Sequence, residues 1–166
     1  MNKKTIPSEQ DQFNSIKKTL KQLKGKPLTI RTLDVGNDKK VPSIEKYLTK
    51  SPNPALGLRA IRLTLAFPKI FKRQITAILR ASSYGNIRIM LPMVSNVSEL
   101  IETKKIIKEV KKDLLKKNKR LKITTPKIGV LIETPAAALI SEELAKNCDF
   151  FAIGTNDLTM YTLAID

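Results

Sequence analysis

The chain has 166 residues, a formal net charge of +16, 42% hydrophobic residues and 28% charged residues. This length and balance are typical of a single soluble globular domain, which we assign to residues 1–166. No run of 18 apolar residues occurs, and no apolar segment follows the basic N-terminus, which argues against a membrane span and a signal peptide. The single cysteine, Cys148, excludes an internal disulfide and is typical of the reducing cytoplasm, where we expect the protein to reside.

The excess of basic residues has two interpretations. A high positive charge is typical of many nucleic-acid-binding proteins. In this chain, however, the densest run of lysines, residues 104–122, alternates with the apolar stripe of one predicted helix. The few aromatic residues are not interleaved with the basic ones, as a stacking platform for bases requires. We therefore interpret the lysines as solvent-facing and keep nucleic-acid binding only as an alternative.

The first half of the chain predicts three helices and one strand. A helix is predicted over 8–24, because its apolar residues recur every three or four positions and Gly25 follows. The β-branched run 28–33 predicts a strand, followed by a loop over 34–39. A second helix is predicted to begin near Pro54 and to end at Pro68, where a third helix over 69–82 starts.

The second half of the chain predicts alternating strands and helices. A strand over 87–93 precedes Asn96 and Glu99, which form the expected N-terminal capping pair of a long helix. A third strand is predicted over 127–132, followed by an Ala-rich helix over 136–147 and a fourth strand over 150–153. Asn156 and Asp157 are predicted in the loop after this strand, with a further helix expected beyond them.

The alternation of strands and helices predicts an α/β fold. The four strands are almost continuously apolar, which is typical of a parallel sheet covered by helices. A closed eight-stranded (β/α) barrel needs about 250 residues. We therefore predict a partial TIM-type barrel of about four parallel strands. Half a barrel has two open sheet edges, so we also expect self-association or a partner.

Polar side chains follow three of the predicted strands, where parallel α/β folds place their chemistry. Glu133 and Asp157 follow strands whose ends would lie roughly 5 Å apart if they are neighbours. Two carboxylates at this spacing favour Mg²⁺, and Arg31 with Arg59 would suit a phosphate. In the alternative interpretation, Glu133 caps the next helix, Arg31 pairs with Asp34, and the Asn-Asp pair is only a turn. The residue pattern alone leaves both interpretations open.

A resemblance to a known family favours the first interpretation. The stretches that carry it are IPSEQDQF, TIRTLDVGNDK, NPALGLRAIRL, AILRASSYGNIRIMLPMVS, IGVLIETPAAALI and DFFAIGTNDLTMYTLAID. In this order and spacing they resemble the phosphoenolpyruvate-binding barrel of the enzyme I family (phosphoenolpyruvate–protein phosphotransferase) of the bacterial sugar phosphotransferase system. The resemblance spans the whole chain and is very specific. Pyruvate phosphate dikinase, from the broader superfamily, is less similar at ETPAA and after GTNDL.

The resemblance implies a reaction and a set of site residues. The family moves the phosphoryl group of phosphoenolpyruvate to a histidine on a separate swivelling domain, and then to a phosphocarrier protein. Magnesium and the arginines would neutralise charge on the transferred group. The residues that match family positions are Arg31 and Arg59 for phosphate, Glu133 and Asp157 for Mg²⁺, Asn156 for the substrate phosphate, and Lys39 in the loop after the first strand.

The chain also departs from the family pattern. The family loop has two glycines where this sequence has Gly36 and Asn37, a mild change because Asn tolerates a positive φ. The chain has no histidine, and Cys148 is not the counterpart of the family's catalytic cysteine because it precedes the GTNDL stretch. We assign no catalytic residue. We expect the chain to be a truncated or split fragment of enzyme I that does not turn over substrate by itself. The missing segments of enzyme I would then be partners of the chain, in addition to the phosphocarrier protein.

Two alternatives from other functional classes remain. The first is a non-catalytic interaction module that dimerises, as enzyme I barrels do. The second is a basic nucleic-acid-binding protein that has reused the fold. The sequence does not separate the sugar-system enzyme from its nitrogen-related paralogue.

Overall fold

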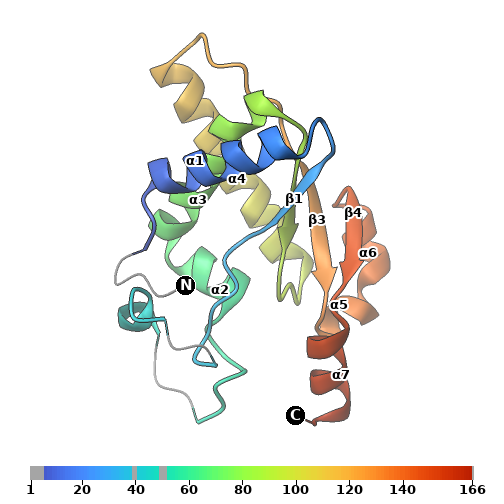
Figure 1. Ribbon diagram of the computed structural model, residues 1–166. Helices are drawn as coiled ribbons and strands as arrows, with labels where there is room; N and C mark the ends of the chain where they lie inside the picture. Colours follow the sequence, from blue (N-terminus) through green and yellow to red (C-terminus); the bar gives the residue numbers. More distant parts are fainter. Residues whose placement is uncertain (1–5, 39–40, 49–51, 166) are drawn as a thin grey trace.

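The structure, a computed structural model, describes residues 6–38, 41–48 and 52–165. Its centre is a parallel sheet of four strands in the order β1-β2-β3-β4 (Figure 1). The strands are β1 (Leu28–Arg31), β2 (Ile87–Leu91), β3 (Lys127–Ile132) and β4 (Phe150–Ile153). The predicted α/β fold with four parallel strands is therefore confirmed, and it is consistent with a partial barrel.

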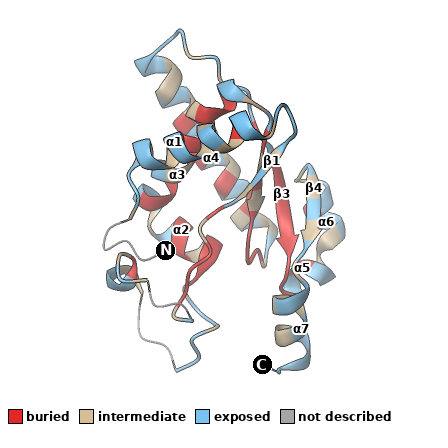
Figure 2. Ribbon diagram, in the orientation of Figure 1, coloured by how far each residue is buried: buried red, intermediate tan, exposed pale blue. Residues whose placement is uncertain are grey.

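Three helices cover one face of the sheet: α1 (Glu9–Gln22), α3 (Pro68–Ala81) and α4 (Val97–Lys117) (Figure 1). Alternate side chains of the central strands, such as Ile89 and Val130, belong to the core that these helices enclose. The ribbon of β3 is accordingly drawn as buried in Figure 2. Burial of each such side chain contributes about 1.5–3 kcal/mol. The outer strands β1 and β4 are only half-buried, because each has a hydrogen-bonded neighbour on one side within the described residues.

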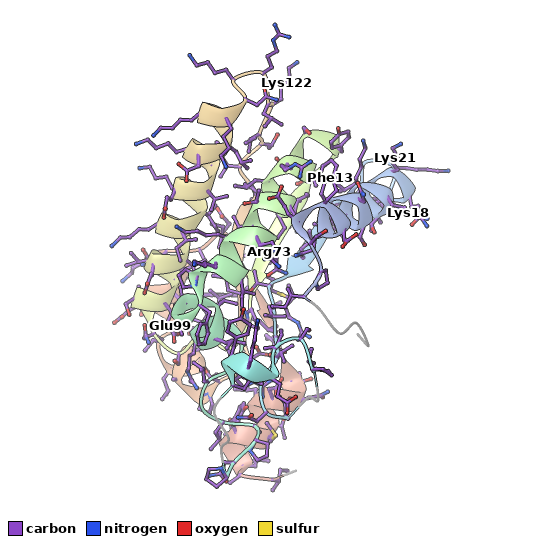
Figure 3. All side chains as sticks on the ribbon, turned by 90° about the vertical axis from the view of Figure 1, so that its left-hand side faces the viewer. Phe13, Lys18, Lys21, Arg73, Glu99 and Lys122 are labelled. Atoms are coloured by element: carbon purple, nitrogen blue, oxygen red, sulfur yellow. The ribbon has the colours of Figure 1, made fainter. Side chains whose placement is uncertain are left out.

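Two helices start at the capping residues that the sequence predicts. The Ser8 side chain accepts a hydrogen bond from the backbone N–H of Asp11. The Asn96 side chain likewise accepts one from the backbone N–H of Glu99. In both cases the acidic side chain returns a bond to the cap residue, which completes a capping box. Lys18 and Lys21 of α1 face outward in Figure 3, as does Lys122 in the segment after α4, in agreement with the solvent-facing interpretation.

The second helix begins later than the sequence predicts. Helix α2 spans Ala60–Ala66, and the residues from Pro54 to Leu58 form turns instead of a first helical turn. Gly57 has a φ of 75°, and Arg59 is extended with φ −142° and ψ 165°. The prediction of a start near Pro54 is wrong because this segment turns to bring Arg59 into the interior, where its side chain is bonded.

The Ala-rich segment is two helices and not one. Helix α5 (Pro135–Leu139) and helix α6 (Ser141–Ala145) meet at Ile140, whose φ of −100° and ψ of 18° are not helical. The break lets Ile140 pack against the main core while Leu139 remains 88% exposed. The predicted continuous helix over 136–147 is therefore wrong in the middle.

The segment after β4 is helical from its first residues. Helix α7 spans Thr155–Leu163, so Asn156 and Asp157 lie in its first turn and not in the predicted loop. A carboxylate is favoured there, because the N-terminus of a helix carries a partial positive charge. Two short 3₁₀ helices, η1 (Glu45–Tyr47) and η2 (Ser82–Tyr84), were not predicted.

Apolar side chains are exposed along the β4 side of the molecule. They include Phe151 at 39% and Ile153 at 69%, on the sheet, and Leu163 at 62%, on α7 (Figure 2). The self-association expected from open sheet edges stays a prediction. Among the described residues, no helix combines the length and the apolar character needed to cross a membrane.

Candidate functional site at the carboxyl ends of the strands

The predicted site residues within the described part of the chain gather beyond the carboxyl ends of the strands. Arg31 ends β1, Glu133 follows β3, and Asp157 lies in α7, directly after β4. Strands β3 and β4 are hydrogen-bonded neighbours, with Ile132 opposite Ile153, so the condition for placing Glu133 and Asp157 at adjacent strand ends is met. Asn156 is exposed beside Asp157. Lys39 lies outside the described residues.

Glu133 is the most deeply buried carboxylate of the site, with 1% of its surface exposed. Its Oε1 accepts a hydrogen bond from the backbone N–H of Met93 at 2.7 Å. The cap of α5 is instead the hydroxyl of Thr134, which accepts a bond from the Ala137 N–H at 3.1 Å. The alternative that Glu133 caps this helix is therefore wrong. Its position leaves the carboxylate free for another role.

Neighbouring charges act on Glu133 in its buried position. Burial raises the pKa of Glu133 to about 7, while the hydrogen bond from Met93 opposes this shift. The charges of Asp157 and Asp34 raise the pKa further, and Arg31 lowers it. The site thus concentrates carboxylates around one buried acid.

Arg31 and Arg59 converge on the carboxylate of Asp34. Nη1 of Arg31 lies 3.3 Å from Asp34 Oδ2, and Nη2 of Arg59 lies 3.1 Å from Asp34 Oδ1. The alternative interpretation predicts that Arg31 pairs with Asp34, and this pair is present. Asp34 also binds Arg59. Arg31 remains 45% exposed at its side chain, whereas Arg59 is enclosed.

Arg59 is kept charged by its surroundings. Burial alone would lower the pKa of Arg59, but the hydrogen bond and charge of Asp34, together with Tyr161 and Asp38, raise it. Close packing also requires Gly36, since a Cβ there would lie 2.7 Å from Arg59 Cβ. The next residue, Asn37, stands where the family pattern has its second glycine. Its φ is not positive, so asparagine is accommodated at this position without backbone strain.

Two residues with strained backbone stand beside the site. Met93, which donates to Glu133, has a φ of 57°, and Ala60, which follows Arg59, has a φ of 48°. For a residue other than glycine such a conformation costs about 1–3 kcal/mol and is concentrated at functional sites. The surrounding fold therefore stabilises both positions against their local preference.

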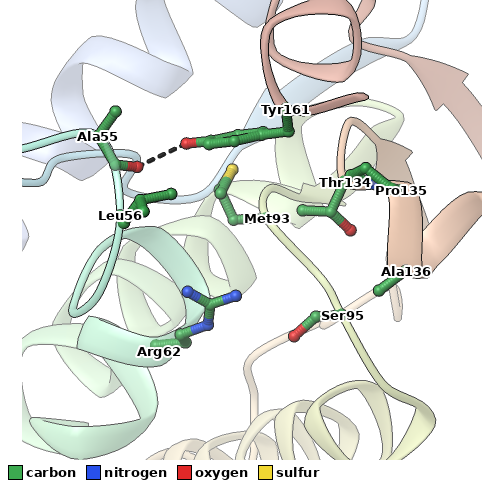
Figure 4. A pocket seen from close by; sticks show the side chains of 9 residues that line it. All are labelled: Ala55, Leu56, Arg62, Met93, Ser95, Thr134, Pro135, Ala136 and Tyr161. Atoms are coloured by element: carbon green, nitrogen blue, oxygen red, sulfur yellow. Dashed lines mark hydrogen bonds between the residues drawn. The ribbon is translucent and has the colours of Figure 1, made fainter. Parts of the chain in front are cut away.

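A shallow cavity of about 200 Å³ lies next to these residues (Figure 4). The segments that follow β1, β2 and β3 line it, including Arg62 of α2 and the start of α5, together with Tyr161 of α7. Its polar side chains include Arg62, Ser95 and Thr134. The lining does not include Arg31, Arg59 or Glu133, so the cavity adjoins the candidate site and is not identical with it.

A family model described as "PEP-utilising enzyme, PEP-binding domain" matches residues 1–166. The chain belongs to this family. Curated relatives are named phosphoenolpyruvate-protein phosphotransferase: those of Bacillus subtilis and of Buchnera aphidicola subsp. Schizaphis graminum are 44% identical, and that of Staphylococcus epidermidis is 45% identical. Each match covers 100% of this chain but only 28% or 29% of the relative. The comparisons give no support to an interaction module or a nucleic-acid-binding protein.

The donor set of this PEP-binding domain fits a divalent cation. Among the described residues, no group of three or more histidine, cysteine, aspartate or glutamate side chains forms a metal cluster. Mg²⁺ does not require one, because it commonly binds through one or two carboxylates and completes its shell with water and phosphate oxygens. The buried Glu133, with the charge of Asp157 beside it, is a donor set of this kind.

Sequence reasoning missed three residues that contribute to the candidate site. Tyr161 reaches Arg59 from α7, Met93 donates to Glu133, and Gly154 provides the space for Glu133. The Tyr161 contact has no local signature, because 102 residues separate it from Arg59. Gly154 lies directly after a strand, a position at which a glycine permits a close approach of another side chain.

We expect Gly154→Ala to destabilise the domain by about 1–3 kcal/mol. The added Cβ would lie 2.7 Å from Glu133 Cβ and 2.8 Å from Glu133 Oε2, so a buried side chain must move. The measurement is the free energy of unfolding in urea. Gly85→Ala is the matched control, because its Cβ would come no closer than 3.1 Å to another atom, a methyl carbon of Leu20. Equal stability of both variants would contradict the tight packing of Glu133.

Proposed function

We propose that this chain binds the phosphate of phosphoenolpyruvate together with Mg²⁺, as part of a phosphoenolpyruvate–protein phosphotransferase. The observation that carries the proposal is the joint position of two arginines and two carboxylates beyond the carboxyl ends of one parallel sheet. The family match over residues 1–166 supports the substrate class. The names of the curated relatives support the reaction class.

The arginines have the role of binding and orienting the phosphate. A guanidinium matches the geometry of phosphate oxygens, and two of them would offset the charge of the transferred group. Asp34 holds one terminal nitrogen of Arg31 and one of Arg59. This arrangement fixes the two cations relative to each other before the substrate arrives, which reduces the entropy lost on binding.

Glu133 and Asp157 would hold the cation, and Asn156 would contact the phosphate beside it. Bound Mg²⁺ supplies positive charge that offsets the developing negative charge of phosphoryl transfer. The first turn of α7 presents Asn156 and Asp157 from the positive end of the helix, which favours an anionic ligand there. Lys39 remains a proposed substrate contact on sequence grounds.

The acceptor of the phosphoryl group in this proposal is a histidine of another segment or protein. The 166 residues contain no histidine, so the role of the chain is to present the donor. A phosphocarrier protein as the final acceptor, and a cytoplasmic location, also belong to the proposal. They rest on the relatives' printed name and on the single free cysteine of the described chain.

Titration calorimetry with phosphoenolpyruvate tests the proposal. We expect binding that requires Mg²⁺ and falls at least tenfold in Glu133→Gln and in Asp157→Asn, because each variant loses a charged ligand of the cation. Glu142→Gln is the matched control, since the Glu142 side chain is 90% exposed on α6. Equal affinity of the wild type and both site variants would refute the assigned ligands.

A further inference from the structure

Arg59 is held by the protein at both of its terminal nitrogens. Nη2 donates to Asp34 Oδ1 at 3.1 Å, while Nη1 donates to the Ala55 carbonyl at 3.1 Å and to the Tyr161 hydroxyl at 3.0 Å. The Nε atom is buried and has no hydrogen-bond partner among the described residues. An arginine with this many fixed contacts has one orientation, and its orientation depends on each of them.

The Tyr161 hydroxyl is used in both of its hydrogen-bonding capacities. It donates its proton to the Ala55 carbonyl at 2.5 Å (Figure 4). It also accepts the hydrogen bond from Arg59 Nη1. Arg59, Tyr161 and Ala55 thus form a closed triangle of hydrogen bonds, which we call the Arg59 triangle. The triangle joins α7 to the turns that precede α2, two segments far apart in the chain.

Tyr161 also shares a helix face with Asp157. The two residues are four positions apart on α7, so their side chains lie one above the other. Burial raises the pKa of the Tyr161 hydroxyl, and the charge of Asp157 raises it further. One face of a short helix therefore presents the proposed metal ligand and the partner of a proposed phosphate arginine.

We infer that Tyr161 is a positioning residue, which orients Arg59 for the substrate phosphate and ties that arginine to the helix that carries Asp157. The inference rests on the proposed function for the role of Arg59, and on the Arg59 triangle for the role of Tyr161. The hydroxyl is the part of Tyr161 that performs this role. The ring packs at the margin of the main core and contributes to stability independently.

The test is Tyr161→Phe, which removes the hydroxyl and keeps the ring. We expect the affinity for phosphoenolpyruvate in the presence of Mg²⁺ to fall about tenfold, as is typical when a charge-assisted hydrogen bond is lost. The affinity for Mg²⁺ alone should remain unchanged, since Glu133 and Asp157 are intact. Tyr47→Phe is the matched control: Tyr47 is half-buried against Phe67, and the described residues give its hydroxyl no hydrogen bond.

A second readout follows Arg59 directly by nuclear magnetic resonance. In the wild type and in Tyr47→Phe, slow rotation of the Arg59 guanidinium should give resolved Nη signals, and these should merge in Tyr161→Phe. A tenfold loss with unchanged Mg²⁺ affinity and merged signals supports the inference. Wild-type substrate affinity in Tyr161→Phe, or an equal loss of Mg²⁺ affinity, overturns it.

The two proposals fail in distinguishable ways. If the wild type does not bind phosphoenolpyruvate, the proposed function is contradicted, and the role of Tyr161 towards a substrate is contradicted with it. The guanidinium signals then still decide whether Tyr161 fixes Arg59. Unchanged signals in Tyr161→Phe overturn the positioning role even if substrate binding is confirmed.

Discussion

Arg59→Met is expected to destabilise the chain by about 3 kcal/mol and to reduce phosphoenolpyruvate binding below detection. Methionine fills much of the volume of arginine but removes a cation with 1% of its surface exposed. Asp34, whose side chain is 4% exposed, then loses its buried partner and retains Arg31, whose side chain is 45% exposed. The main cost is the loss of one member of a buried ion pair, because removing one partner of such a pair is strongly unfavourable even when a more exposed partner remains.

Urea unfolding of Arg59→Met and of the double variant Arg59→Met/Asp34→Asn measures this cost. Asparagine removes the charge of Asp34, which has lost its most buried partner, so the double variant should be more stable than Arg59→Met alone. Arg62→Met, three positions further along in α2, is the matched control, since Arg62 is only partly buried and donates to the Gly57 carbonyl at 3.1 Å. We expect it to cost less than about 1 kcal/mol. Additive effects of the Arg59 and Asp34 substitutions would contradict the coupling between the two groups.

The strands and their order were predictable because the sheet is built from local signals. Each strand is a short apolar run bounded by turn residues or a capping pair, and successive strands are joined by helices, which forces parallel neighbours. The proximity of Glu133 and Asp157 follows from the same reasoning, because each comes directly after one of two adjacent strands. The positions of candidate site residues that directly follow the strands can therefore be predicted from the sequence.

The start of α2 was not predictable from local signals. The helical spacing of Leu58, Ile61 and Leu65 continues upstream of the real helix, so periodicity favours an earlier start. The extended backbone at Arg59 accompanies side-chain bonds to Asp34 and Tyr161, which belong to other parts of the chain. Long-range contacts of this kind override local propensity, and they are also the reason that the Arg59 triangle was missed.

The largest pH effect is expected from Glu133. Its pKa is raised from 4.5 to about 7 in the folded chain, mainly by burial. The charges of Asp157 and Asp34 raise the pKa further, whereas the hydrogen bond from Met93 and the charge of Arg31 lower it. The fold therefore favours the protonated acid. The stability that this acid contributes is full below pH 4.5 and is lost as the pH rises through 7. Without metal, the chain should lose about 2–3 kcal/mol from this group between pH 5 and pH 8.

Glu133→Gln isolates this contribution, because glutamine keeps an oxygen for the Met93 N–H and carries no charge at any pH. Urea unfolding of the wild type and the variant at pH 5, 6, 7 and 8 gives the difference, and Glu142→Gln, whose side chain is 90% exposed, serves as the control. The variant should be the more stable protein at pH 8 by about 2–3 kcal/mol, with a much smaller difference at pH 5. Added Mg²⁺ should stabilise the wild type at pH 8 and leave Glu133→Gln nearly unchanged, because the cation binds the ionised acid and removes its unfavourable charge. Parallel pH curves for the wild type and Glu133→Gln would show that this carboxylate is already ionised and compensated in the folded chain.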